Sequence, residues 1–463
     1  MRPYQVTNPA TGKVIQSFDT ASDEQIQATL ADAHRAFQSW KDTSIAQRKN
    51  YLLAIAEQYR KHQRELAEIV TEEMGKPIRA SMGEVGFVIS IIEYYAQHGE
   101  SLLSPDTIAV AKGTATVLKR PLGVLFGIMP WNYPHYQVIR FLAPNLMAGN
   151  TVILKHAEQC PKTAQAIEQL LLDAGLPKGV YSNTFASIEQ SATIIKDPRV
   201  QAVSLTGSER AGQAVATTAG QALKKVVLEL GGSDAFILCD DINQDDELDK
   251  VVKKAISARY GNCGQACNAG KRFIIMENVY DAFMSKFIAK VQAITPADPT
   301  LNDTFMGPMS SRLACEGLQK QVNSAIKQGA TVLVDGGMRA DNIDGQAWFD
   351  PMVLTDVTPS MDVYHQELFG PVAVVHKVST IDEAIALAND VPYGLGASIH
   401  TNNSDTANYL AEKLDVGMVT INDESSTEAE TPFGGVKLSG FGRELGDIGI
   451  TEFLNFKLIR DKS

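Results

Sequence analysis

Apolar side chains recur at helical spacing through the first hundred residues of the chain. Between residues 23 and 40 they lie three or four positions apart, which predicts an amphipathic helix. Ser44 can cap a second stretch with the same period, which continues to Gly75, and a third stretch covers about 79–99. The pattern therefore predicts three helices before residue 100.

From residue 123 onward, short apolar runs alternate with helical stretches. The first series predicts strands at 124–128, 151–155, 182–185, 202–205 and 226–228. The second series follows Gly231-Gly232 and predicts strands at 235–238, 272–276, 331–334, 372–376 and 417–421, with helices at 245–259, 278–294 and 381–389. Such alternation is typical of parallel sheets covered by helices. We expect an α/β fold with two doubly wound parallel sheets and a domain boundary near residue 232.

Residues 107–119 change to a period of two around Gly113, which predicts a β-hairpin. A strand pair of this kind needs a covering surface. That surface is either a partner subunit or another part of the same chain.

Composition and charge exclude several classes of partner. The chain has 463 residues, of which 44% are hydrophobic and 21% charged, as in ordinary globular proteins. Its formal net charge of −12 argues against binding to nucleic acid or to an anionic membrane surface. An odd count of five cysteines indicates a reducing compartment, and the first residues resemble no targeting peptide, so we expect a cytoplasmic protein.

Cys263 and Cys267 are the candidate nucleophiles. They lie in a glycine-rich segment, residues 261–272, between a predicted helix and a predicted strand, where a side chain can stand exposed. A thiolate is a strong nucleophile near neutral pH. Cys263 and Cys267 are a poor zinc pair, because no second pair follows and no histidine is near, so no metal is expected. A buried structural cysteine remains the alternative.

Two further residues have candidate catalytic roles. Asn132, in Pro130-Trp131-Asn132-Tyr133-Pro134, follows a strand and can direct its amide at a developing oxyanion, or it forms a turn or cap. Glu229 lies between apolar neighbours beside Gly-Gly, where burial would raise its pKa and suit a general base. An exposed residue beside a turn is the alternative for Glu229.

Polar residues also follow two other predicted strands. Lys155 and Glu158 could bind ribose hydroxyls or form a solvated ion pair. Gly207 and Ser208 open a helix whose first amides could hold a phosphate. Neither segment is a G-x-G-x-x-G fingerprint, so each signal is weak alone.

Together these motifs resemble the aldehyde dehydrogenase superfamily over nearly the whole chain, from Asn8-Pro9 to Gly442-Arg443-Glu444. The resemblance implies that Cys267 is the nucleophile, Glu229 the general base and Asn132 the oxyanion donor. It implies that the cofactor is bound by Trp131, Lys155, Glu158, Gly207, Ser208, Leu230, Glu367 and Phe369. It also implies a dinucleotide-binding domain (1–106 and 120–231), a catalytic domain (232–430) and oligomerisation strands (107–119 and 445–463).

Within the superfamily the chain looks most like bacterial NAD(P)-dependent succinate-semialdehyde dehydrogenases. Arg140 matches the arginine that binds the substrate carboxylate in that group, and Tyr136 shares its helix face. A planar guanidinium suits a carboxylate; an Arg in a surface ion pair is the alternative. Ser426 and Thr427 are also expected at the substrate.

We therefore expect an enzyme that oxidises succinate semialdehyde to succinate through a cysteine thioester. Glu158 favours NAD, because a carboxylate at the ribose repels a 2′-phosphate, and Lys155 leaves NADP as a weaker substitute. The resemblance implies a homodimer or homotetramer. The alternatives are a dehydrogenase for glutarate semialdehyde or a broad aliphatic range, a nucleotide-independent cysteine hydrolase or thioesterase, and a catalytically silent binding protein. Glu229, suited to activating water, disfavours a CoA-acylating relative.

Overall fold

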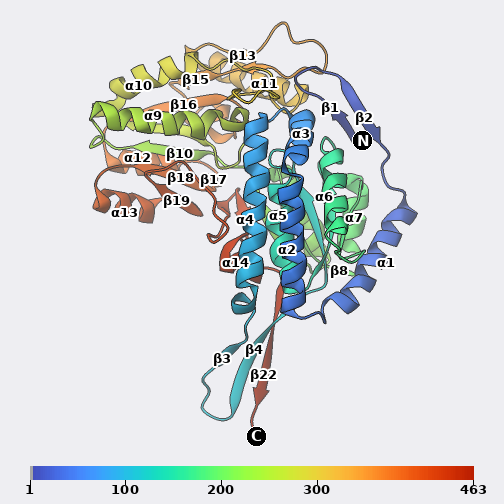
Figure 1. The fold of residues 1–463 in the computed structure, drawn as a ribbon. Helices are drawn as coiled ribbons and strands as arrows, with labels where there is room; N and C mark the ends of the chain where they lie inside the picture. The colour runs from blue at the N-terminus through green and yellow to red at the C-terminus, as the bar shows by residue number, and fades with distance from the viewer. Residues whose placement is uncertain (1–3) are drawn as a thin grey trace.

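Two large sheets with helices on their faces organise the molecule, and the chain passes from one to the other after residue 229 (Figure 1). The computed structural model describes residues 4–463. The first sheet has six strands, in the spatial order β21 (Gly440–Phe441), β9 (Lys225–Glu229), β8 (Val200–Thr206), β5 (Val124–Met129), β6 (Thr151–His156) and β7 (Tyr181–Asn183). Its neighbouring strands are parallel except for β21, which is antiparallel to β9.

The second sheet has seven strands. Their order is β12 (Thr331–Val334), β15 (Met352–Thr355), β16 (Val372–Val378), β11 (Gly270–Met276), β10 (Asp234–Leu238), β18 (Gly396–His400) and β19 (Met418–Ile421). Only β12 and β15 pair antiparallel in it. The predicted α/β class is confirmed, but the prediction of wholly parallel sheets was wrong for one edge strand of each sheet. The sequence interpretation also missed β15 and β18.

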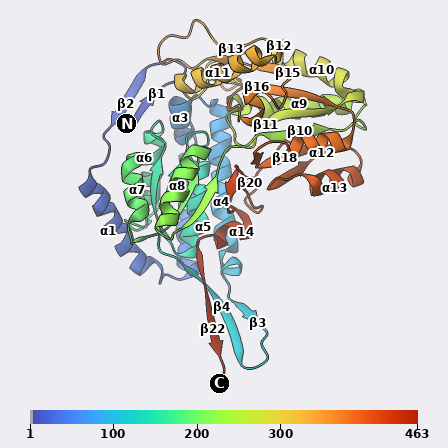
Figure 2. The same cartoon turned by 180° about the vertical axis from the view of Figure 1, so that it is seen from behind.

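Helices cover both faces of the first sheet (Figure 1 and Figure 2). They are α1 (Asp23–Trp40), α2 (Ile45–Lys61), α3 (Gln63–Met74), α4 (Ile78–Leu102), α5 (Tyr136–Ala148), α6 (Pro161–Asp173), α7 (Ile188–Lys196) and α8 (Glu209–Gln221). Successive strand residues point to opposite faces. Leu125 accordingly packs into the core under α2, α4 and α5, and Phe126 packs into the core under α1 and α8. Two covered faces explain why β5 is a continuous apolar run.

The helices around the second sheet include two that the sequence interpretation missed, α11 and α13. The set is α9 (Asp245–Tyr260), α10 (Glu277–Gln292), α11 (Arg312–Gln328), α12 (Ile381–Asn389) and α13 (Ser404–Lys413). Three short strand pairs and two turns lie outside the large sheets: β1 (Tyr4–Thr7) with β2 (Val14–Phe18), β13 (Gly337–Met338) with β14 (Phe349–Asp350), β17 (Tyr393–Gly394) with β20 (Val436–Lys437), and the turns η1 (Gly261–Gly264) and η2 (Asp362–His365). Among residues 4–463, no helix has both the length and the apolar composition needed to cross a membrane.

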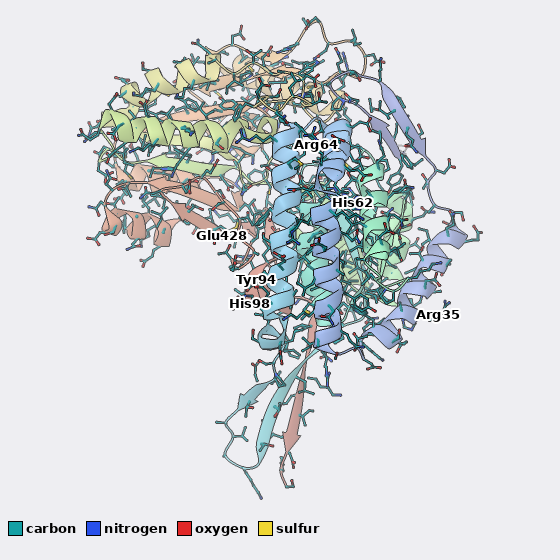
Figure 3. All side chains as sticks on the ribbon, viewed as in Figure 1. Arg35, His62, Arg64, Tyr94, His98 and Glu428 are labelled. Carbon is teal, nitrogen blue, oxygen red and sulfur yellow. The ribbon has the colours of Figure 1, made fainter. Side chains whose placement is uncertain are left out.

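The predicted single helix from Ser44 to Gly75 was wrong, because the chain breaks at His62. Ser44 caps α2 through a reciprocal pair of hydrogen bonds with Gln47, as its position predicted. His62 ends α2 and precedes α3, and Figure 3 labels it at this junction. Gly75 ends α3 in the left-handed conformation, φ +75°. Both halves keep the same helical period, so periodicity alone does not show the break.

Three strands form an arm that extends away from the two large sheets (Figure 1). The arm contains β3 (Asp106–Ile108), β4 (Thr114–Pro121) and β22 (Leu454–Asp461), with β4 in the middle. The hairpin predicted at 107–119 is confirmed. The stretch 445–463 is not strand throughout, because Gly446–Thr451 forms helix α14, which packs against α5.

Candidate active site

An unusual backbone conformation precedes the predicted nucleophile. Helix α9 ends at Tyr260, and Asn262, Cys263 and Gly264 then have φ values of +50°, +56° and +69°. Side chains other than glycine avoid this left-handed region, so two such residues in a row mark a locally strained turn. The turn redirects the chain from α9 toward β11 and leaves Cys267 between them.

Cys267 lies at a cavity and is not sealed in the core. It is half-buried, whereas the other four cysteines, all free thiols, are buried: Cys160, Cys239, Cys263 and Cys315. Burial raises the pKa of the Cys267 thiol to about 12, and the positive charges of Arg140 and Lys271 act in the opposite direction. The alternative of a structural cysteine therefore fits Cys263 and does not fit Cys267.

The cavity beside Cys267 has a volume of about 280 Å³. It opens where the first sheet reverses its strand order, since β6 lies on one side of β5 and β8 on the other. Ligands bind at such a reversal in α/β sheets, beyond the carboxyl ends of the strands. Its lining includes eight residues predicted for the site: Trp131, Asn132, Gly207, Ser208, Leu230, Cys267, Glu367 and Phe369.

Asn132 is buried at the cavity wall, and its side chain is held from both ends. Its Nδ2 donates a hydrogen bond to the Gln265 carbonyl, 3.1 Å away, and its Oδ1 accepts from Gln137 Nε2 at 2.9 Å. Asn262 Nδ2 donates to the Asn132 carbonyl at 3.0 Å. The side-chain amide of Asn132 has two N–H groups, and one of them donates to the Gln265 carbonyl. The second N–H is left to donate to a ligand oxygen in the cavity.

Glu229 ends β9 and is almost fully buried, with 1% of its surface exposed. Within the described part of the chain, neither of its carboxylate oxygens has a hydrogen-bond partner. Burial raises its pKa well above the usual value, and the charge of Arg140 opposes that shift. The exposed alternative is wrong. Glu229 is not part of the cavity lining, but its neighbour Leu230 is.

Arg140 lies in the core, so a surface ion pair is excluded. The guanidinium forms a buried ion pair with Glu444 and donates hydrogen bonds to Thr206 Oγ1 at 3.1 Å and Tyr136 Oη at 3.3 Å. Its central carbon lies 4.5 Å from the centre of the Phe433 ring. Thr206 belongs to the cavity lining and Arg140 does not, so the guanidinium lies behind the cavity wall.

The residues predicted for the cofactor ribose lie at the end of β6. Lys155 Nζ is 2.7 Å from Glu158 Oε1, and Lys155 is buried, so the pair is not fully solvated. Glu158 also lines a second cavity of about 350 Å³ together with Ser187 and Arg210. Ser208, at the start of α8, accepts a hydrogen bond from the amide of Ala211 at 3.4 Å and caps the helix.

These features fit a dinucleotide. The amino end of α8, a helix of 13 residues, opens at the cavity through Gly207 and Ser208 and suits a phosphate. The Lys155–Glu158 pair provides a donor and an acceptor for ribose hydroxyls. Trp131 and Phe369 form an edge-to-face pair with ring centres 5.7 Å apart, and both rings line the cavity with Cys267.

The predicted substrate residues Ser426 and Thr427 lie outside the cavity lining. Ser426 is exposed and Thr427 half-buried. Their neighbour Ser425 accepts a hydrogen bond from Asn268 Nδ2 at 3.2 Å, which ties the loop to the residue after Cys267. The structure thus brings this loop near the nucleophile without placing either predicted side chain at the cavity.

The comparisons with known proteins agree with these motifs. The sequence model described as the aldehyde dehydrogenase family matches residues 1–459. The chain is 50% identical over 459 residues to the succinate-semialdehyde dehydrogenase (NADP(+)) of Deinococcus radiodurans, covering 99% of this chain and 95% of that protein. The chain belongs to the aldehyde dehydrogenase family.

Two other members of the aldehyde dehydrogenase family are also similar. The succinate semialdehyde dehydrogenase (NAD(P)+) of Escherichia coli is 40% identical, with 98% of this chain and 96% of that protein covered. A crystal structure of succinic semialdehyde dehydrogenase from Streptococcus pyogenes in complex with NADP+ has a TM-score of 0.96 and 38% identity, covering 99% of this chain and 100% of that one. The predicted family and fold are confirmed.

Sequence reasoning missed several residues of this aldehyde dehydrogenase site. Lys271 is the clearest case: it is buried, lies 3.0 Å from Glu367, and donates to the carbonyls of Cys267 at 2.7 Å and Ala266 at 2.8 Å. Its signal was a lysine beside the buried apolar strand Phe273–Met276. No comparable local signal indicates that Glu444 pairs with Arg140, because the two residues are distant in the sequence.

Proposed function

We propose that this chain oxidises succinate semialdehyde to succinate with NAD(P) through a thioester on Cys267. The observation that carries the proposal is the position of Cys267 and Asn132 on one cavity at the strand-order reversal, with Glu229 buried behind it. Relatives bearing the succinate-semialdehyde dehydrogenase name, at 40–50% identity over nearly the whole chain, support the choice of substrate.

The side chains divide the reaction between them. Cys267 first releases its thiol proton to solvent. Its thiolate Sγ then bonds to the aldehyde carbon, and the negative charge moves to the aldehyde oxygen. The Asn132 amide and the backbone N–H of Cys267 stabilise that oxyanion. When bound, NAD(P) supplies the acceptor for the hydride that leaves this carbon, so the carbon becomes a thioester.

Glu229 then takes a proton from a water molecule, whose oxygen attacks the thioester carbon. The C–S bond breaks and returns the electron pair to Cys267. A carboxylate whose pKa is raised by burial is a stronger base than an exposed one, which suits this step.

We assign the substrate carboxylate to Arg140. The guanidinium carries five N–H groups. Its hydrogen bonds to Thr206 and Tyr136 hold it next to Thr206, on the side of that residue away from the cavity. The ion pair with Glu444 offsets part of its charge. Reaching Arg140 therefore requires the carboxylate to enter beyond Thr206, which restricts the site to a short, narrow acid.

We infer that both cofactors are accepted. Glu158 disfavours a 2′-phosphate, as the sequence suggested, whereas Lys155 and Arg210 provide positive charges at the same end of the site. The predicted preference for NAD remains a prediction, because the relatives from Deinococcus radiodurans and Streptococcus pyogenes are named or crystallised with NADP.

We also propose that the arm formed by β3, β4 and β22 pairs with a second copy of the chain, in a homodimer or homotetramer. Its exposed apolar side chains are Ile108, Phe456, Leu458 and Ile459. An exposed apolar strand surface of this kind needs a cover.

An aldehyde panel tests the substrate assignment. We expect kcat/KM to be highest for succinate semialdehyde, lower for glutarate semialdehyde and lowest for butanal, with NAD and with NADP.

The double variant Arg140→Met/Glu444→Gln removes the buried pair without leaving an unpaired charge. It should raise KM for the semialdehyde about tenfold or more, because the substrate carboxylate loses a hydrogen bond to a charged group and the binding free energy of that bond.

Glu444→Gln alone is the comparison variant that retains Arg140. Because it leaves the guanidinium without its buried partner, its thermal unfolding is measured alongside its kinetics. Equal changes in KM for succinate semialdehyde and for butanal in the double variant would contradict the assignment of Arg140.

A further inference from the structure

The turn that carries Asn132 joins β5 to α5, and it needs external support. Helix α5 begins at Tyr136 without a side-chain cap from the preceding His135. Every residue of α5 is buried, so water cannot satisfy the first amides of the helix. The amide of Gln137 donates to the Tyr133 carbonyl at 3.0 Å, so the amides of His135 and Tyr136 are the ones that need a partner from another element.

Glu84 on helix α4 supplies that partner. Its Oε1 accepts hydrogen bonds from the backbone amides of His135 at 2.9 Å and Tyr136 at 3.1 Å. Its Oε2 forms a buried ion pair with Lys76, whose ammonium lies 3.7 Å from the centre of the Tyr133 ring. One carboxylate thus caps α5 and, through Lys76, holds the residue that follows Asn132.

His156, the last residue of β6, holds the same turn from a different element. The backbone amide of Ala157 donates to His156 Nδ1 at 2.8 Å, so the proton of the neutral ring is on Nε2. That Nε2 donates to the carbonyl of Pro134 at 3.0 Å. Burial lowers the pKa of His156 to about 4, which keeps the ring in this one neutral form near pH 7.

We propose that Glu84 and His156 are positioning residues that hold the backbone of residues 134–136 and thereby fix the amide of Asn132 at the oxyanion. An oxyanion donor acts only within a narrow distance range, so a small shift of the turn weakens it. The proposal rests on the role of Asn132 in the proposed function.

The primary test replaces His156 by Leu, which removes the donor to Pro134, and by Gln, whose amide can still donate. We expect His156→Leu to lower kcat roughly tenfold, part of the 10²–10³-fold that a whole oxyanion donor contributes, with KM for the cofactor little changed. His156→Gln should recover most of kcat. Tyr59→Phe is the matched control, because it deletes a buried 3.3 Å contact to the His135 ring on the same turn without touching the backbone ties.

A double-mutant cycle with Asn132→Ala separates positioning from general damage. If His156 acts through Asn132, His156→Leu should change kcat less than about twofold once Asn132 is Ala. The same loss in both backgrounds, or an equal loss in Tyr59→Phe, would overturn the proposal. If Asn132→Ala alone leaves kcat unchanged, the assigned role of Asn132 fails instead.

The variant Lys76→Met/Glu84→Met provides the second route if His156→Leu does not fold. It removes the cap of α5 and leaves no unpaired buried charge. We expect the same loss of kcat and the same disappearance of the effect in the Asn132→Ala background. An unchanged kcat in a folded Lys76→Met/Glu84→Met variant would contradict the positioning role of Glu84.

Discussion

Cys267 is held as a neutral thiol by its surroundings. Burial favours the uncharged form, and the nearby charges of Arg140 and Lys271 offset only part of that effect, so the pKa stays at about 12. Burial likewise raises the pKa of Glu229 well above its usual value, which makes its carboxylate a stronger base than an exposed one. Cys267 is thus stored as a thiol and must lose its proton before it attacks the aldehyde.

The raised pKa of Cys267 predicts how alkylation depends on pH. Below its pKa the thiolate fraction of a cysteine rises about tenfold per pH unit. The second-order rate of carbamidomethylation by iodoacetamide should therefore rise about tenfold per unit between pH 7 and pH 9, measured by intact mass. Cys267→Ala is the control for the four buried cysteines. A rate that levels off between about pH 8.5 and pH 9 would mean an ordinary pKa, and a rate already flat at pH 7 would mean a lowered one.

The turn before Cys267 and the two missed strands, β15 and β18, show how far the local pattern of apolar and polar residues can predict the structure. The glycine-rich segment between helix and strand marked a candidate site, and the family resemblance then separated Cys267 from Cys263. β18 was missed because Gly-Ala-Ser-Ile-His has small and polar residues that only the surrounding strands bury. The break at His62 and the pairing of Arg140 with Glu444 depend on tertiary contacts, which no local period encodes.

The left-handed turn before Cys267 predicts different outcomes for two nearby glycines. Gly264 has φ +69°, and an added Cβ would collide with the Gly370 carbonyl. Gly264→Ala should destabilise the fold by roughly 1–3 kcal/mol and lower kcat, since the turn sets the position of Cys267. Chemical denaturation and steady-state kinetics measure the two effects.

Gly261→Ala is the matched control in the same turn, because an added Cβ there meets no atom within 4 Å and its φ is −55°. It should be neutral or slightly stabilising. Equal destabilisation by the two substitutions would show that the left-handed backbone is not the cause.

At the scale of the whole molecule, the three-stranded arm is a separate sheet that contributes no residue to the lining of the cavity beside Cys267. The cavity is lined by residues that follow β5, β8 and β9 of the first sheet and by Cys267, which precedes β11 of the second. The arm extends away from both sheets (Figure 2). The period of two predicted the hairpin of β3 and β4, and the family resemblance implied the third strand of the arm. Neither could predict that α14 interrupts 445–463, because that short helix is stabilised by contact with α5.

Polar substitutions on the arm test its proposed role in assembly. Phe456 and Leu458, 49% and 60% exposed, lie on one face of β22. Phe456→Ser/Leu458→Ser should lower the molar mass measured by light scattering to that of a smaller assembly, with little change in the fold of the two sheets. Lys457→Ser, on the opposite face of β22, is the control and should leave the mass unchanged. An unchanged mass in the double variant would exclude the arm as the interface.

The most direct test of the account is the intact mass of Glu229→Gln after mixing with succinate semialdehyde and NADP+ or NAD+. Because Gln cannot take a proton from water, the thioester should form and persist. We predict one equivalent of reduced cofactor and a mass increase of one succinyl group, located by peptide mapping on Cys267 and absent in Cys267→Ala/Glu229→Gln. Full turnover without an acyl adduct would contradict the roles of both residues.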